Sequence, residues 1–100
     1  MAALTLTQHQ DACKRGLEKL RDGGKLSRAA KRKVERVLGS SKGLKRFAAD
    51  VKFSIQNSEG TDTPILDKLQ AIVDWFIRNQ DKILAIISFI MKIAPLLFIV

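Results

Sequence analysis

The sequence predicts an all-α protein in which a basic three-helix unit precedes one long helix. Apolar residues recur at helical spacing through most of the 100 residues. The charge is unevenly distributed, since residues 1–58 hold fourteen Lys and Arg against five Asp and Glu, and residues 59–100 hold four against five. We therefore expect residues 1–58 to form a basic head that faces an anionic partner, such as nucleic acid, acidic lipid headgroups or an acidic protein surface.

The first predicted helix covers residues 8–22. Thr7 can cap its first turn, and Gln10 follows three residues later, which is the spacing of a capping box. Two consecutive glycines, Gly23 and Gly24, end the helical pattern because glycine leaves the helical conformation at little cost.

Two further helices are predicted over residues 28–38 and 42–55. Ser27 is the expected N-cap of the second helix, and Gly39 is its expected end. The third helix begins at the Ser-Ser pair that follows this glycine. A polar stretch without large apolar side chains then predicts a linker, which we place at residues 59–63.

The fourth predicted helix is long and runs over residues 64–94. Thr63 and Pro64 form a strong start, with a capping hydroxyl followed by proline at the first helical position. No residue breaks the helical pattern before Pro95. The helix is amphipathic at first and hydrophobic later, so residues 83–100 are a candidate membrane anchor at the lower limit of a transmembrane length.

A polar seam follows this predicted helix. Its positions recur every seven residues in two neighbouring rows, the second of which has Ala85 between its two charged residues, and the remaining positions are mostly apolar. The seam consists of Asp67, Asp74, Asp81 and Ser88, with Arg78 and Lys92 beside them. Such a row of polar residues is either exposed to solvent or buried against other helices, where its charges can form ion pairs.

Catalysis is not expected. His9 and Cys13 are four residues apart and share one helical face, but no third residue is placed to orient a histidine base. Cys13 also belongs to an apolar stripe. We therefore expect a non-enzymatic protein without catalytic, cofactor-binding or metal-binding residues.

The candidate binding site for an anionic partner lies within residues 25–52. The cations there permit nonspecific phosphate contacts, a solvated face, or a DNA-reading helix, although the second helix has no Asn or Gln to read base edges. The expected binding residues are Arg28, Lys31, Arg32, Lys33, Arg36, Lys42, Lys45 and Arg46.

A second group is expected to contact lipid or other helices through residues 64–100. Trp75 and Phe76 suit the headgroup level of a bilayer or a protein core equally well. Lys92 either extends its ammonium to the bilayer surface or pairs with an acid in an assembly of helices. The full set is Trp75, Phe76, Ile83, Ile87, Phe89, Ile90 and Lys92.

These patterns favour a small membrane-associated structural or assembly protein, with its basic head on the cytoplasmic or interior side. A basic region joined to a short hydrophobic helix is similar in plan to small phage and viral membrane proteins. Two alternatives stay open: a soluble structural subunit of a large assembly such as a virion, with basic helices facing nucleic acid, and a holin-like pore. In each case we expect a homo-oligomer or a larger assembly.

Overall fold

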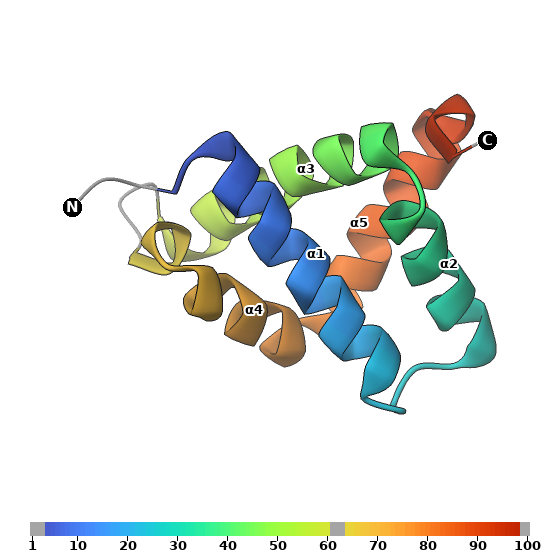
Figure 1. Ribbon diagram of the computed structural model, residues 1–100, viewed down its shortest axis with the longest axis horizontal. Helices are drawn as coiled ribbons and strands as arrows, with labels where there is room; N and C mark the ends of the chain where they lie inside the picture. Colours follow the sequence, from blue (N-terminus) through green and yellow to red (C-terminus); the bar gives the residue numbers. More distant parts are fainter. Residues whose placement is uncertain (1–3, 61–63, 99–100) are drawn as a thin grey trace.

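The computed structural model describes residues 4–60 and 64–98, which are helical and contain no strand (Figure 1). The predicted all-α class is confirmed. The elements in chain order are α1 (Leu6–Asp22), α2 (Arg28–Leu38), α3 (Ser41–Glu59), the 3-10 helix η1 (Pro64–Asp67), α4 (Leu69–Arg78), α5 (Gln80–Ile93) and the 3-10 helix η2 (Pro95–Phe98).

Helix α1 begins two residues earlier than predicted. The Thr5 hydroxyl accepts a hydrogen bond from the Gln8 backbone N–H at 3.1 Å, and the Gln8 side chain accepts one from the Thr5 N–H at 2.9 Å. The two bonds form a reciprocal capping box at Thr5 and Gln8, whereas this motif was predicted at Thr7 and Gln10. Because the sequence offers the T-x-x-Q pattern twice, two residues apart, the local pattern could not decide between them.

The ends of α2 and the start of α3 confirm the predicted signals. Ser27 caps α2 by accepting from the Ala30 N–H, and Gly39 is the C-cap of the same helix. Ser40 caps α3 through the Gly43 N–H at 3.0 Å. Helix α3 continues to Glu59 and thus runs past its predicted end. Residues 61–63 of the predicted linker, including the proposed cap Thr63, lie outside the described residues.

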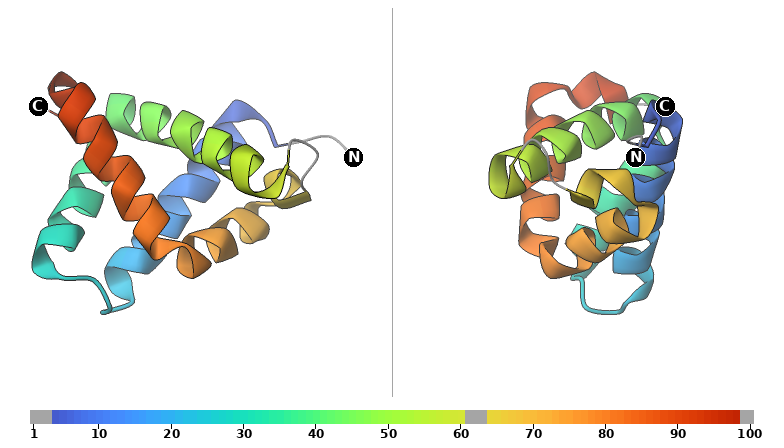
Figure 2. Two further views of the ribbon diagram at one scale, coloured as in Figure 1. Left: turned by 180° about the vertical axis from the view of Figure 1, so that it is seen from behind. Right: turned by 90° about the vertical axis from the view of Figure 1, so that its left-hand side faces the viewer.

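The prediction of a single helix over residues 64–94 is wrong. This segment is divided into η1, α4 and α5, with the main break at Asn79, whose φ of −130° and ψ of 43° are not helical. Figure 2 shows α5 leaving the direction of α4 at this bend. Within the described residues, no helix has both the length and the apolar character required to cross a bilayer. Neither proline nor glycine stands at the bend, so tertiary packing decides where the helix breaks.

Helices α4 and α5 pack against α1, α2 and α3 in one hydrophobic core. Helix α4 lies along α1, where Gly16 faces the ring of Phe76 so closely that an added Cβ would come within 2.5 Å of it. Phe47 of α3 meets the same ring edge-on at 5.8 Å between centroids. The large fully buried side chains of α4 and α5 are Ile72, Trp75, Phe76, Ile83, Ile87 and Ile90.

Candidate anionic surface and its apolar flank

Three arginines of the predicted binding site follow the exposed side of α2. Arg28, Arg32 and Arg36 are spaced four residues apart and therefore lie along one stripe of the helix. In the described part of the chain, none of the three forms an ion pair. We call these residues the arginine stripe. Its charge is free to meet an external anion.

The other predicted cations differ in their surroundings. Lys42 and Lys45 of α3 are exposed, and Lys31 of α2 is half-buried. Arg46 lies 3.5 Å from the Asp50 carboxylate, one turn further along the helix. This pairing partly neutralises Arg46 and makes it a weaker candidate than the arginine stripe.

Lys33 faces the interior of the fold instead of the exposed side of α2. Its Nζ donates a hydrogen bond to the Ser88 hydroxyl of α5 at 2.9 Å, and both residues are half-buried. Ser88, a member of the polar seam, is therefore hydrogen-bonded to the basic head. Lys33 was predicted to be a binding cation because the neighbouring residues on α2 are also basic. The sequence does not indicate that Ser88 lies close to it in the fold.

The rest of the polar seam mostly faces solvent. Asp74, Arg78, Asp81 and Lys92 are exposed, while Asp67 is half-buried. Asp74 accepts a hydrogen bond from the side chain of its neighbour Gln70 at 3.0 Å.

Helix α5 carries apolar side chains both on its buried side and on an exposed flank next to it. Its inner side carries Ile83, Ile87 and Ile90, which are completely buried. Its outer side continues into η2 and exposes three large apolar side chains, which we call the apolar ridge: Phe89 (57% exposed), Ile93 (48%) and Leu96 (78%). Lys92 lies on the same outer side. Sequence reasoning selected Phe89 but missed Ile93 and Leu96, because the hydrophobicity of residues 83–100 is too uniform to separate an inner from an outer face.

Helix η2, which carries Leu96 of the apolar ridge, lies beside the C-terminal end of α2, where Arg32 and Arg36 stand. Figures 1 and 2 show η2 against the turn that joins α2 to α3. There the Ser40 hydroxyl donates to the Leu97 carbonyl oxygen. Phe98 lines a surface hollow of about 420 Å³ together with Arg32, Arg36 and Glu35. Two arginines of the stripe thus adjoin a half-buried aromatic side chain of η2.

The pair formed by His9 and Cys13 lies in the core. The His9 Nε2 is 2.8 Å from the Ala48 carbonyl oxygen, which can only accept, so this nitrogen carries the proton. The Cys13 Sγ lies 3.7 Å from the same nitrogen. Burial lowers the pKa of His9 and raises the pKa of the Cys13 thiol. The thiol therefore stays protonated, and the pair joins α1 to α3 without an activated nucleophile.

Among the described residues, no cluster of three or more His, Cys, Asp or Glu side chains is placed to hold a metal ion. No family model, curated protein or solved structure matches this chain. The surface chemistry of the chain itself, above all the arginine stripe and the apolar ridge, is therefore the basis for a functional proposal.

Proposed function

We propose that the protein is a small, non-enzymatic, membrane-associated structural or assembly protein that binds an anionic bilayer surface without crossing the bilayer. The observation that carries this proposal is that η2, which carries Leu96 of the apolar ridge, adjoins Arg32 and Arg36 of the arginine stripe through Phe98. The arginines attract acidic headgroups, and the ridge enters the boundary between headgroups and acyl chains. For both contacts to form together, one orientation of the protein must bring both surfaces to the bilayer.

Both contributions favour binding. Each Lys or Arg held near an anionic leaflet contributes about 1 kcal/mol, so the three arginines contribute roughly 3 kcal/mol. Apolar area removed from water contributes about 25 cal/mol per Å². The ridge side chains are already exposed, so their transfer into the interface breaks no internal contact.

Lys92 fits this orientation. Its aliphatic stem shares the outer side of α5 with Phe89 and Ile93, and its ammonium can extend to the headgroups. A DNA or RNA backbone would satisfy the same cations, but its phosphates offer no apolar partner to the ridge. The surface therefore favours lipid over nucleic acid, and the nucleic-acid-facing subunit becomes the competing outcome of the test.

The first prediction is that the full chain floats with vesicles of phosphatidylcholine and phosphatidylserine but not with vesicles of phosphatidylcholine alone. The combined change Arg28→Gln, Arg32→Gln and Arg36→Gln should weaken binding at least about tenfold, because three headgroup contacts are lost. Changing Phe89, Ile93 and Leu96 to Ser should remove the part of binding that persists in high salt, because burial of apolar area is not screened by salt.

The control removes equal charge elsewhere, at the exposed Lys14, Lys52 and Lys68, by the same change to Gln. This variant should retain most of the binding. If it weakens binding as much as the arginine variant does, only net charge matters and the proposed face is wrong. If a short DNA duplex competes the protein off the vesicles and the ridge variant binds that duplex as tightly as the unchanged chain, the nucleic-acid alternative replaces the membrane proposal.

A further inference from the structure

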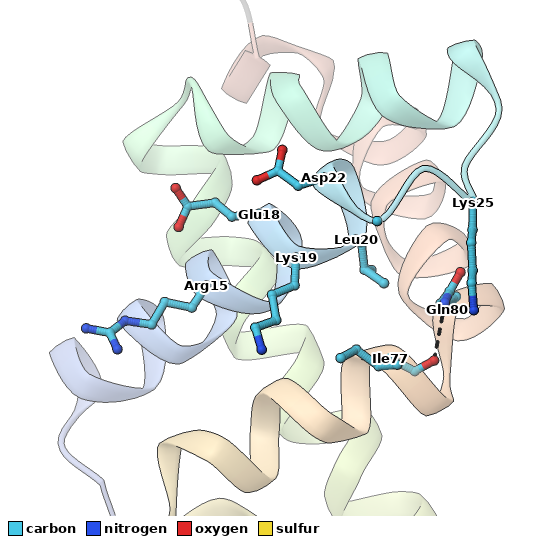
Figure 3. Close-up of a pocket in the computed structure, with 9 residues that line it drawn as sticks. Arg15, Glu18, Lys19, Leu20, Asp22, Lys25, Ile77 and Gln80 are labelled. Atoms are coloured by element: carbon cyan, nitrogen blue, oxygen red, sulfur yellow. Dashed lines mark hydrogen bonds between the residues drawn. The ribbon is translucent and has the colours of Figure 1, made fainter.

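A second hollow lies where the last turns of α1 meet the bend between α4 and α5 (Figure 3). It has a volume of about 530 Å³, which is within the range of pockets that hold small organic ligands. None of its lining residues belongs to the arginine stripe or the apolar ridge. Any ligand bound there would therefore be recognised independently of the membrane surface proposed above.

The floor of this hollow is apolar. Leu20 of α1 is almost completely buried, at 4% exposed, and Ile77 of α4 is 44% exposed although the two residues before it, Trp75 and Phe76, belong to the core. Figure 3 shows the Leu20 and Ile77 side chains between those of Lys19 and Lys25. The hollow thus offers an apolar body a place to lie against a fixed part of the core.

The rim carries a small excess of unpaired positive charge. Arg15 is engaged by Asp11 at 3.2 Å, and Asp22 is engaged by Arg21 at 3.0 Å. Lys19 and Lys25 have no ion pair in the part of the chain that the structure describes. In Figure 3 the Lys25 side chain extends toward Gln80, whereas the Lys19 side chain extends toward α4 on the other side of Ile77.

Glu18 is the remaining unpaired acid of the lining within the described residues. Two free ammonium groups against one free carboxylate leave one positive charge to be balanced. The charge of the hollow is therefore complementary to a ligand with one negative charge.

We propose that this hollow binds a single-chain amphiphile with one anionic headgroup, such as a long-chain carboxylate. The headgroup lies at the rim against a lysine ammonium group, that of Lys19 or Lys25, and the chain lies across Leu20 and Ile77. A cationic amphiphile with the same chain would meet a hollow with a net positive charge, so the headgroup charge determines which ligand binds.

The experiment is a titration of the full chain with dodecanoate below its micellar concentration, followed by backbone amide chemical shifts. We expect the largest shifts in residues 15–25 and 76–82. The double change Lys19→Gln and Lys25→Gln, and separately Ile77→Ser, should each weaken binding at least about tenfold, since a charge-assisted contact or the apolar floor is lost. The matched control, Lys14→Gln with Lys68→Gln, should bind as the unchanged chain does.

Thermal unfolding of each variant checks that it is folded, which we expect because Lys19 and Lys25 are exposed and Ile77 is partly exposed. Equal binding of dodecyltrimethylammonium would overturn the proposal, because headgroup charge would then play no role. Shifts centred on Phe89, Ile93 and Leu96 would also overturn it, by placing the amphiphile on the apolar ridge. Neither result depends on whether the protein binds vesicles.

Discussion

Helices α1, α2 and α3 differ from α4 and α5 in what fixes their ends. Each of the first three begins at a Ser or Thr whose hydroxyl caps the first turn, at Thr5, Ser27 and Ser40. Helices α4 and α5 begin without a side-chain cap, at Lys68 and Asn79. The ends of the first group are therefore specified by the local sequence, whereas those of the second depend on tertiary contacts.

The bend at Asn79 shows how such a boundary is maintained. The Asn79 side chain donates to the Trp75 carbonyl oxygen at 2.9 Å, which satisfies a group that the break in the helix leaves open. On both sides of the bend, large side chains of α4 and α5 are buried in the core. The indole N–H of Trp75 has no hydrogen-bond partner among the described atoms. The Trp75 ring itself is buried in the apolar core.

The substitution Phe76→Ala should have the strongest effect on stability. The Phe76 ring is fully buried between Gly16 of α1 and Phe47 of α3, and its removal should lower the free energy of unfolding by about 3–5 kcal/mol. Urea unfolding followed by circular dichroism measures this change. The control is Phe89→Ala on the exposed ridge, with an expected loss below about 1 kcal/mol. Similar losses in both variants would show that α4 is not held mainly by packing at Phe76.

A smaller effect is expected from pH through His9, the buried polar link between α1 and α3. Burial, with the nearby charge of Lys52, lowers the pKa of His9 in the folded protein, and the bond to Ala48 only partly opposes this. Below about pH 6.5 the unfolded chain therefore takes up a proton more readily than the folded one, and stability falls as pH falls.

The free energy of unfolding should decrease between about pH 7.5 and 5, with a slope of up to roughly 1.4 kcal/mol per pH unit. Urea unfolding at a series of pH values measures it. His9→Gln, which does not titrate, should flatten the profile in this interval. An unchanged slope in the variant would assign the pH dependence to other groups.

The substitution Ser27→Ala, which removes the cap of α2, should have the weakest effect. The loss of the hydrogen bond from the Ala30 N–H should cost about 1 kcal/mol of stability. Ser41→Ala is the control, because Ser41 is exposed and follows the capping residue of α3. If both changes have the same small effect, caps do not set the ends of the first three helices, and the contrast with α4 and α5 disappears.

Local sequence was enough to specify the helical class, the cap at Ser27, the Ser-Ser pair at the start of α3, the helix end at Gly39 and the position of the cationic residues. These features depend on residues within four positions of one another, since a cap or a helical stripe is a local relation. Even the error at α1 was local, because two T-x-x-Q patterns overlap there. The arginine stripe was likewise predicted from spacing alone.

Long-range packing, by contrast, set the bend at Asn79, the contact of Lys33 with Ser88 and the division of α5 into a buried face and the apolar ridge. Each depends on residues far apart in the sequence, as the 55 positions that separate Lys33 from Ser88 illustrate. A segment that is apolar at nearly every position outside one narrow polar seam carries little periodic signal for which of its apolar sides will be buried. That choice is made when α5 packs against α2 and α3, and the exposed side left by this packing is the one that we propose meets the membrane.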